Sequence, residues 1–463
     1  MTIKIINHSA SATEIVNFSK ARYVDPATID QEWQHIWRST WLVAGLTGDV
    51  ESPGDFFVFD LEREQILVTK TSNGEVQAFY NVCQHRGNRL ITHERGHAAN
   101  FRCAYHAWTY SIDGELAAVP YAERFKDGVP CDRGLKKVRT EIWNGIVFIN
   151  MDDGAEPLRT YLGPVVDHLA PYRFDAMTLV EDQTVRLNCN WKAVVDNFSE
   201  LYHVDFLHPQ HRRMVDCCND TVHLFDRGHT GLAVPGATYN PRFPTPEMPT
   251  DIHRAQLLGL ELDPDDFIGR VPEIRRAVQV QRRKTGREKG FDYDAFTDDQ
   301  LSDVWQYNLF PNVILSFTPG HLWLMRVRPD AVDPGKCLFD KYSFVLFADP
   351  QMATTPSETD RAAPSPAPQD AQASLSVRQT RRTHIGVTAT KPADYVRPQR
   401  DVFDYSAVVA GEKTMTDTID QDVELLGNVQ AGMSSAAFDT TWLNDDEMRV
   451  QHFHNEVDRR LRG

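Results

Sequence analysis

The sequence has no apolar run long enough to cross a bilayer, and its first residues show no basic region followed by an apolar core. Cysteine is also scarce: there are seven in 463 residues, and their spacing matches no disulfide framework of a secreted protein. A membrane-spanning protein and a disulfide-stabilised scaffold are therefore not expected. We predict a chain without membrane contact in the reducing cytoplasm.

Positive charge is in deficit. Lysine and arginine total 49 against 65 aspartates and glutamates, which gives a net charge of −16. Nucleic acids and anionic membranes attract the opposite sign, so neither is expected as a partner. The basic residues between about 245 and 300 predict a solvated helix face on a surface insertion; they are Arg275, Arg276, Arg282, Arg283, Lys284, Arg287 and Lys289. A second insertion, about residues 350 to 383, is rich in proline, alanine and serine and predicts a surface loop.

Two patterns of cofactor binding are missing as well. No G-x-G-x-x-G motif follows a strand, and no C-x4-C-x2-C pattern of a plant-type ferredoxin is present. The chain is therefore not expected to accept electrons from NAD(P)H directly.

What the sequence does contain is Cys83, His85, Cys103 and His106 in the order C-x-H-x17-C-x2-H. In a Rieske [2Fe–2S] centre two imidazoles replace two thiolates on one iron, so each half of this pattern would supply one ligand to each iron. A zinc site is the alternative, although zinc usually pairs cysteine with cysteine and histidine with histidine.

A second candidate site has the spacing E-x2-H-x4-H, formed by Glu200, His203 and His208. Two histidines and one carboxylate on one face of a metal are typical of non-haem Fe(II) oxygenases. Positions five apart on a helix point about 140° away from each other, so we expect His208 to lie past the helix end, next to Pro209. Glu200 would lie on the same helical face as His203 and reach its other ring nitrogen.

The third ligand must be an acid from elsewhere, and the stretch from Asp417 to Gln430 offers four acids. On a helical projection only Asp422 falls within the apolar arc, whose members are Ile419, Val423, Leu425, Leu426 and Val429. A buried carboxylate is costly unless it is paired or bound to a metal. We therefore predict Asp422 as the ligand; the alternative is an acid favoured near a helix N-terminus.

These motifs resemble those of the Rieske non-haem iron oxygenases, specifically the terminal oxygenase α subunit. The resemblance covers nearly the whole chain. The family's C-x-H-R-G hairpin matches Cys83 to Gly87, and its C-P-Y-H-x-W hairpin matches Cys103 to Trp108 with Ala104 in place of proline. Its E-D-x6-V-Q-x-G pattern matches the segment from Gln421 to Gly432, with glutamine in the first place.

The resemblance also assigns roles near the second site. Glu200 would bridge His203 to His106 of a neighbouring subunit and carry electrons between them. Most members have aspartate there, and glutamate resembles the carnitine and related quaternary-amine oxygenases. Asn197 resembles an active-site asparagine of ring-hydroxylating members, although the spacing differs by one residue. An apolar substrate wall is expected from Phe198, Leu201, Phe206 and Leu207; core packing explains these residues equally well.

The expected fold class is α+β. Residues 1–40 would form N-terminal helices that pack on the catalytic domain, with helical spacing from Ile29 to Trp37. Residues 41–155 would form a β-rich Rieske domain, and residues 156–463 a helix-grip-type catalytic domain with an antiparallel sheet covered by helices. Three runs predict neighbouring strands of that sheet, at 313–318, 322–328 and 342–348.

The function implied is that of a terminal oxygenase component. It would use O2, a Rieske [2Fe–2S] cluster and a mononuclear Fe(II), with electrons from a separate reductase or ferredoxin and ultimately from NAD(P)H, to hydroxylate an aromatic or other hydrophobic organic substrate. A homotrimer, with or without a small β subunit, is expected. Oxidative N- or O-demethylation is the alternative within the family. A Rieske electron-transfer protein with a non-catalytic binding domain and a zinc-stabilised binding module are alternatives of other classes.

Overall fold

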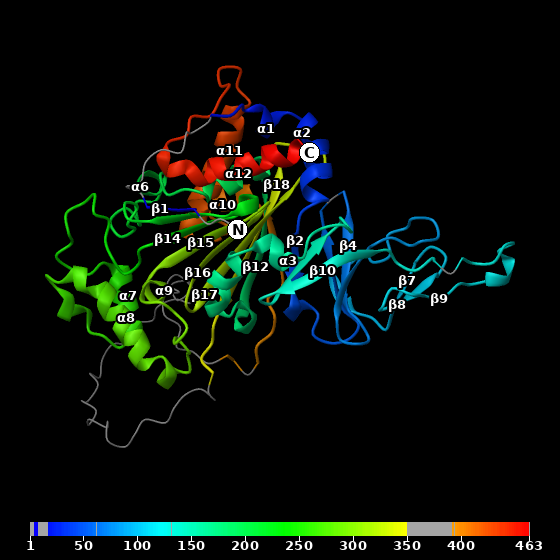
Figure 1. Cartoon of the computed structure of the whole chain (residues 1–463), viewed down its shortest axis with the longest axis horizontal. Coiled ribbons are helices and arrows are strands. Elements are labelled where there is room, and N and C mark those ends of the chain that lie inside the picture. The colour runs from blue at the N-terminus through cyan, green and yellow to red at the C-terminus, as the bar shows by residue number, and fades with distance from the viewer. Residues whose placement is uncertain are drawn as a thin grey trace.

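The computed structural model describes residues 4–7, 17–61, 63–130, 132–349, 391–392 and 394–462. It contains a nine-stranded sheet covered by helices and a β-rich part at one end of the molecule (Figure 1). The predicted α+β class is therefore confirmed. The predicted loop at about residues 350–383 lies outside the described residues.

The β-rich part has a seven-stranded sheet and a three-stranded sheet, and all of their strand pairs are antiparallel. Along the strand Asp55–Asp60, Phe56 faces one cluster of buried side chains and Phe57 and Phe59 face another, because neighbouring residues of a strand point to opposite faces. The larger sheet has the order β2 (Leu42–Leu46), β11 (Ile146–Asn150), β10 (Lys137–Trp143), β5 (Val76–Tyr80), β4 (Gln65–Lys70), β3 (Asp55–Asp60), β6 (Arg95–His97). The smaller sheet is β7 (Asn100–Arg102), β8 (Thr109–Ser111), β9 (Leu116–Ala118).

The nine-stranded sheet pairs its strands antiparallel except at one edge, where β12 and β19 are parallel. Its order is β1 (Lys4–Asn7), β13 (Thr221–Leu224), β14 (Thr230–Val234), β15 (Val304–Leu309), β16 (Val313–Thr318), β17 (His321–Pro329), β18 (Cys337–Val345), β12 (Thr178–Leu187), β19 (Asp401–Asp404). The three predicted runs are the neighbours β16, β17 and β18, and the third ends at Val345 rather than at residue 348.

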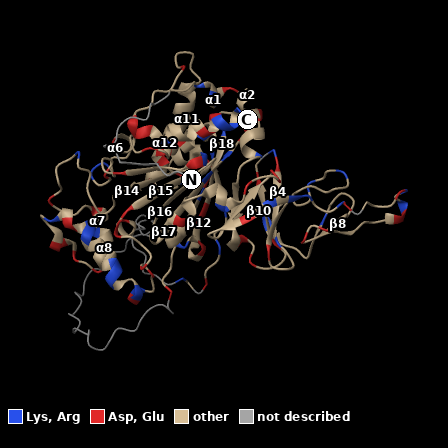
Figure 2. Ribbon diagram, in the orientation of Figure 1, with Lys and Arg blue, Asp and Glu red and all other residues tan. Residues whose placement is uncertain are grey.

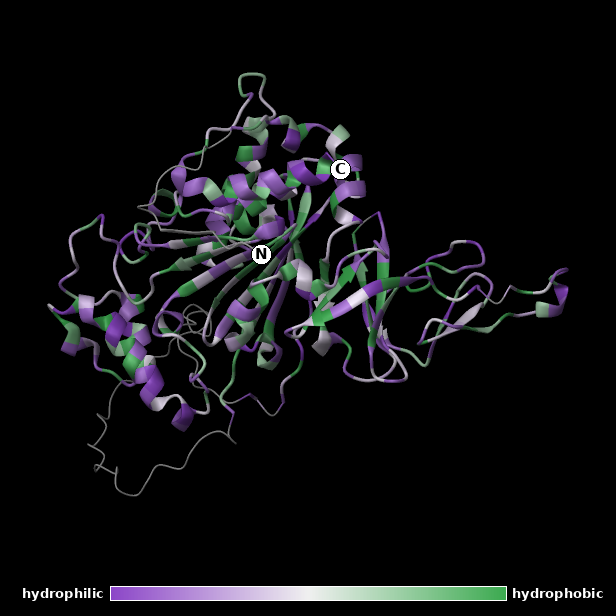
Figure 3. Cartoon of the chain, in the orientation of Figure 1, coloured by the Kyte–Doolittle hydropathy of each residue, from purple (hydrophilic) through white to green (hydrophobic). Residues whose placement is uncertain are grey.

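Helices cover both faces of this sheet. One face packs on α5 (Trp191–Asn197), α11 (Asp417–Met433) and α12 (Met448–Leu461), and the other on α3 (Leu158–Leu162), α4 (Val165–Leu169) and α9 (Asp298–Ser302). Alternation along β16 places Ile314 in the first cluster and Leu315 in the second. In Figure 3 the helices above the sheet mix hydrophilic and hydrophobic residues, as amphipathic helices do.

The prediction that residues 1–40 form helices is partly wrong, because β1 lies in this segment and is an edge strand of the nine-stranded sheet. The rest of the described N-terminal segment is only partly a regular α-helix. It contains α1 (Ala21–Val24), α2 (Ala27–Glu32) and a π-helical turn from Trp33 to Trp37. Ile36 and Trp37 are buried in the same cluster as α5 and α12. The described chain holds no helix that is both long and apolar enough to cross a membrane.

The insertion at about residues 245–300 contains α7 (Asp251–Gly259), α8 (Ile274–Thr285) and α9. Basic and acidic residues both occur along the ribbon of this region, as blue and red segments in Figure 2. Arg275 pairs with Asp299 at 2.7 Å, and Asp298 takes both Arg276 at 2.7 Å and Arg283 at 2.8 Å. These ion pairs offset the basic charge locally. The predicted solvated face is only partly found, because Arg275, Arg282 and Lys289 are half-buried.

Candidate metal centres

Two loops of the β-rich part carry the C-x-H-x17-C-x2-H residues, and both have the same backbone turn. The first follows β5, where Gly87 N donates to Cys83 O (3.0 Å). The second follows β7, where Ala107 N donates to Cys103 O (3.0 Å). Both turns close on a residue with positive φ, 73° at Gly87 and 58° at Ala107. The two halves of the sequence pattern therefore form a matched pair of loops.

The four side chains of these loops lie together at their tips. Cys83 and Cys103 are buried, whereas His85 and His106 are half-buried. The two imidazole rings have centroids 4.7 Å apart, and His85 stacks on Trp108 at 4.9 Å with an interplanar angle of 6°. Burial lowers the pKa of His85, and the positive charges of its neighbours lower it further. A neutral imidazole is the form that binds a metal.

Polar groups surround the two sulfur atoms. The hydroxyl of Tyr110 lies 3.4 Å from Cys83 Sγ, and Asn88 Nδ2 donates to Cys103 Sγ at 3.8 Å. Burial opposes ionisation of Cys103, but backbone N–H groups of its own turn outweigh that effect and lower the pKa of its thiol. These donors suit thiolate ligands, whose redox properties depend on such hydrogen bonds.

The same loops test the zinc alternative. Four ligands of one zinc ion, with bonds of about 2.0–2.3 Å, must converge on a single point. Within the part of the chain that the structure describes, one group of three or more His, Cys, Asp or Glu residues has all its ligand atoms within 4.8 Å of one another. That group is His203, His208 and Asp422, and it does not include the Cys/His loops. The Cys/His set is too spread for one ion and fits a centre with two metals.

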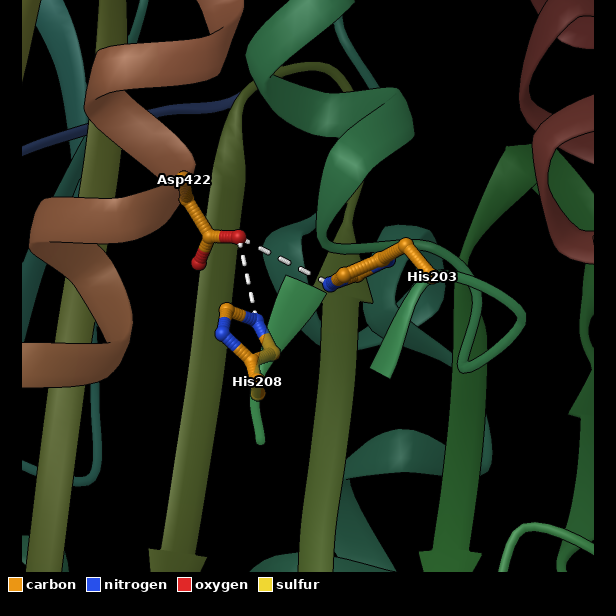
Figure 4. A group of neighbouring side chains, drawn as sticks. All are labelled: His203, His208 and Asp422. Carbon is orange, nitrogen blue, oxygen red and sulfur yellow. Dashed lines mark ion pairs between the residues drawn. The ribbon is translucent and has the colours of Figure 1, made fainter. Parts of the chain in front are cut away.

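His203, His208 and Asp422 form the second centre (Figure 4). The two histidines flank the single-turn helix α6 (Val204–Leu207), one at each cap, and Asp422 comes from α11. Asp422 Oδ1 lies 3.2 Å from His208 Nε2 and 3.6 Å from His203 Nε2. As the spacing predicts, His208 lies past the helix end, with φ −112° and ψ 75°.

The chemistry of this set fits a mononuclear iron. The residue Asp422 is 1% exposed, and its Oδ1 accepts no hydrogen bond from the described residues. An ionised carboxylate in that position needs a compensating positive charge. Two imidazole nitrogens converge on the same oxygen, so an Fe(II) between the three side chains supplies what the carboxylate lacks.

Glu200 holds His203 by two contacts. Its Oε1 lies 2.5 Å from His203 Nδ1, and its Oε2 accepts from the backbone N of His203 at 3.0 Å. Burial alone would lower the pKa of His203, but the hydrogen bond and charge of Glu200, helped by Asp422, raise it. The ring is thereby fixed with Nε2 toward Asp422.

Comparison with known proteins assigns the chain to a family. The Rieske [2Fe-2S] domain family matches residues 40–138, and the family "Ring hydroxylating alpha subunit (catalytic domain)" matches residues 174–382 and 378–463, more than half of the chain. The chain belongs to the ring hydroxylating alpha subunit family. Its two domains imply a [2Fe–2S] cluster and a mononuclear iron, which confirms the predicted cofactors.

Relatives within this family include mono- and dioxygenases. The glycine betaine monooxygenase oxygenase subunit of Pseudomonas aeruginosa (strain UCBPP-PA14) is 32% identical over 188 residues, and the biphenyl 2,3-dioxygenase subunit alpha of Rhodococcus jostii (strain RHA1) is 35% identical over 188 residues. These alignments cover 41% and 39% of this chain and 44% and 41% of the relatives, so the chain matches less than half of their length.

Solved structures agree with the fold along the whole chain. A quaternary ammonium Rieske monooxygenase has a TM-score of 0.64 at 17% identity and covers 96% of this chain and 95% of its own. Naphthalene 1,2-dioxygenase with bound indole has a TM-score of 0.64 at 16% identity and covers 99% of this chain and 95% of its own. At such identity these likenesses show the fold alone.

The expectation that Glu200 and His203 share one helical face is wrong. α5 ends at Asn197, and α6 begins only at Val204. Glu200 lies in the break, where its side chain accepts the backbone N–H of His203. A side chain that hydrogen-bonds its local backbone competes with the helical pattern. Glu200 therefore reaches His203 from a turn and not along a helix face.

The four residues expected to form an apolar wall have different surroundings. Phe198 is buried and stacks on Phe339 with ring centroids 5.8 Å apart, and Leu201 packs beside a cluster on β13 and β14. Phe206 is 75% exposed, and Leu207 is half-buried. The structure does not support a common wall.

Asn197 closes α5 directly before the break. Its Nδ2 is buried and has no hydrogen-bond partner within the described chain. This free donor is compatible with a ligand-binding role, which stays a prediction.

Sequence reasoning missed the groups that orient His208. Its Nδ1 lies 2.7 Å from Gln421 Oε1, directly before Asp422 on α11. The expected apolar arc of α11 was also partly wrong, because Leu425 is 39% exposed and Gln430 is buried. The available signals for Gln421 were its place next to a predicted ligand and its departure from glutamate in the resembling pattern.

Proposed function

We propose that this chain is the terminal oxygenase component of a multicomponent Rieske oxygenase, acting in the cytoplasm. One observation carries the proposal: the same chain contains the paired Cys/His loops and a separate His-His-Asp triad whose carboxylate is buried and unsatisfied. A carrier of electrons needs only the first set. Residues 41–155 would form the Rieske domain and residues 156–463 the catalytic domain.

The ligand roles follow from the two sets. Cys83, His85, Cys103 and His106 would hold the Rieske cluster, and His203, His208 and Asp422 the mononuclear iron. Once bound, the cluster supplies single electrons and the iron supplies a place where O2 is activated for oxygenation of an organic substrate. The protein contributes the geometry: Glu200 fixes the ring of His203, and the end of α6 turns His208 toward the same carboxylate.

The two centres lie in different parts of one chain. In Figure 1 the loops around β7 and β8 are at the right end, whereas α6 and α11 lie to the left and at the top. The side chain of Glu200 is nearly buried but keeps 11% of its surface exposed. We infer that Glu200 links His203 to the cluster of a neighbouring subunit in a homotrimer, with or without a β subunit, since head-to-tail contacts close into rings.

Electrons would come from NAD(P)H through a separate reductase or ferredoxin. The substrate class we propose is an aromatic or other hydrophobic organic molecule, with oxidative N- or O-demethylation as the second candidate. The second is favoured by the similarity to a glycine betaine monooxygenase subunit and by glutamate at position 200. Product analysis with aromatic and with N- or O-methylated compounds, using a surrogate reductase, separates the two.

Iron content tests the oxygenase against an electron-transfer protein. We expect about three irons and two acid-labile sulfides per chain, because the cluster holds two irons and the triad one. Asp422→Ala should retain the cluster absorbance, lose the third iron and lose turnover. Asp417→Ala, an exposed acid at the start of the same helix, is the control and should resemble the wild type. Two irons in the wild type, or full turnover in Asp422→Ala, would contradict the proposal.

A further inference from the structure

The two histidines of the triad differ in what holds their outer ring nitrogen. His203 Nδ1 lies 2.5 Å from a carboxylate oxygen of Glu200, whereas His208 Nδ1 lies 2.7 Å from the amide oxygen of Gln421. Both partners accept a hydrogen bond, but only the first carries charge. The outer hydrogen bonds of the site are therefore asymmetric.

The Gln421 amide also pairs with a second glutamine. Gln210 Nε2 donates to the same Oε1 at 2.9 Å, and Gln421 Nε2 donates back to Gln210 Oε1 at 3.5 Å. A metal at His208 Nε2 needs the lone pair of that nitrogen, so Nδ1 must carry the hydrogen, and Gln421 Oε1 is placed to accept it. The lone pair of His208 Nε2 then faces Asp422 Oδ1, 3.2 Å away.

Consecutive residues of α11 thus contact both nitrogens of one ring. Gln421 fixes Nδ1, and Asp422 lies opposite Nε2. A carboxylate acceptor at the outer nitrogen would increase the electron donation of the imidazole to a metal, and an amide does so less. The family pattern that the segment resembles has glutamate at this place.

We propose that Gln421 is a positioning residue that fixes His208 in its metal-binding tautomer and keeps it the weaker donor of the two histidines. This role presupposes the oxygenase function proposed above. The neutral amide leaves the site with one negative charge fewer than a glutamate would. The ferric form is therefore less stabilised than it would be with glutamate at position 421. The reduction potential of the mononuclear iron is correspondingly higher than with glutamate.

Three substitutions separate the parts of this role. Gln421→Leu removes the acceptor, Gln421→Glu keeps an acceptor and adds charge, and Gln210→Leu removes only the supporting donor. Asn428→Leu is the matched control, because it places leucine at an exposed amide position of the same helix. The cluster absorbance and far-ultraviolet circular dichroism show whether each variant folds.

The first readout is the Fe(II) affinity, measured by competition with a ferrous chelator. The second is the reduction potential of the mononuclear iron, measured by a redox titration that follows the electron paramagnetic resonance signal of its ferric form. In Gln421→Leu we expect roughly a 10- to 100-fold loss of Fe(II) affinity, and in Gln210→Leu a smaller loss. Gln421→Glu should retain affinity and shift the potential downward.

Two results would overturn the role of Gln421. One is an Fe(II) affinity of Gln421→Leu equal to that of Asn428→Leu. The other is a potential in Gln421→Glu that stays unchanged or rises. A wild-type chain that binds only two irons would instead remove the proposed function and this role together, so the two failures are distinguishable.

Discussion

At the scale of single residues, two acids near the same imidazole have different surroundings. Asp422 is buried and its Oδ1 accepts no hydrogen bond within the described chain, whereas Glu200 binds both the ring and the backbone of His203. The first arrangement leaves a negative charge available to a metal. The second uses the charge to hold and polarise the imidazole that we propose as a ligand.

Replacing Glu200 by glutamine tests whether the charge of Glu200 is needed for electron transfer to the second centre. Glu200→Gln should keep both metals, because glutamine still offers an oxygen to His203 Nδ1. We expect transfer of electrons from the cluster to the second centre to slow by roughly 10- to 100-fold, as measured by rapid mixing of the reduced, substrate-bound protein with O2. Glu447→Gln is the control: it removes the charge of another acid, whose Oε2 accepts a hydrogen bond from Asn444 N. Equal rates in wild type and Glu200→Gln would rule out the bridge.

At the scale of elements, His229 joins three segments of the catalytic part. It is fully buried directly before β14, its Nε2 donates to Tyr161 O of α3 at 3.0 Å, and its Nδ1 accepts from Phe310 N after β15 at 3.0 Å. Protonation would remove the acceptor and place a charge in the core. Burial accordingly lowers the pKa of His229 to about 4.

This histidine makes stability depend on pH. The unfolded chain takes up a proton near pH 6.5 and the folded one only near 4, so the contribution is complete above about 6.5 and decreases as the pH falls to about 4. Between about pH 6.5 and about pH 5 the free energy of unfolding should fall by roughly 2 kcal/mol from this residue. Urea unfolding of wild type and His229→Gln at both pH values measures it. The variant should be less stable at neutral pH but lose less on acidification; parallel losses would contradict the assignment.

At the scale of the whole molecule, two arginines of β17 join the catalytic sheet to the β-rich part. Arg326 donates to Val43 O at 2.8 Å and to Ala44 O at 2.9 Å, and Arg328 donates to Asp60 O at 2.9 Å. Both also bind Asp340 of β18, which is fully buried. Burial would raise the pKa of Asp340, but the two guanidinium groups outweigh it and hold that pKa well below its usual range.

Asp340→Asn would leave two buried guanidinium groups without their counter-ion. We expect a loss of about 3–5 kcal/mol in the free energy of unfolding, measured by urea titration. Asp404→Asn, in which the acid is exposed and 3.8 Å from Arg186, should change stability by less than about 1 kcal/mol. An Asp340→Asn protein as stable as the control would show that the ion pairs of Asp340 with Arg326 and Arg328 contribute little to joining the catalytic sheet to the β-rich part.

The limits of sequence reasoning follow from how far each interaction reaches. The proximity of His203 and His208 was predictable because their spacing is local, and the burial of Asp422 was predictable because it falls within an apolar arc. Gln430 was not, since it is buried by contacts with Asn190 N at 2.8 Å and Tyr23 O at 3.2 Å, 240 and 407 residues away. The parallel pairing of β19 with β12 likewise joins segments more than 200 residues apart.

The single turn of α6 leaves no freedom in the length of the chain between His203 and His208. One residue more or fewer would rotate the second imidazole by about 100° and move it by about 1.5 Å along the helix axis. The two rings would then no longer meet at one carboxylate oxygen. Insertions and deletions in homologues of this chain should consequently be absent between the two histidines and begin only after Pro209.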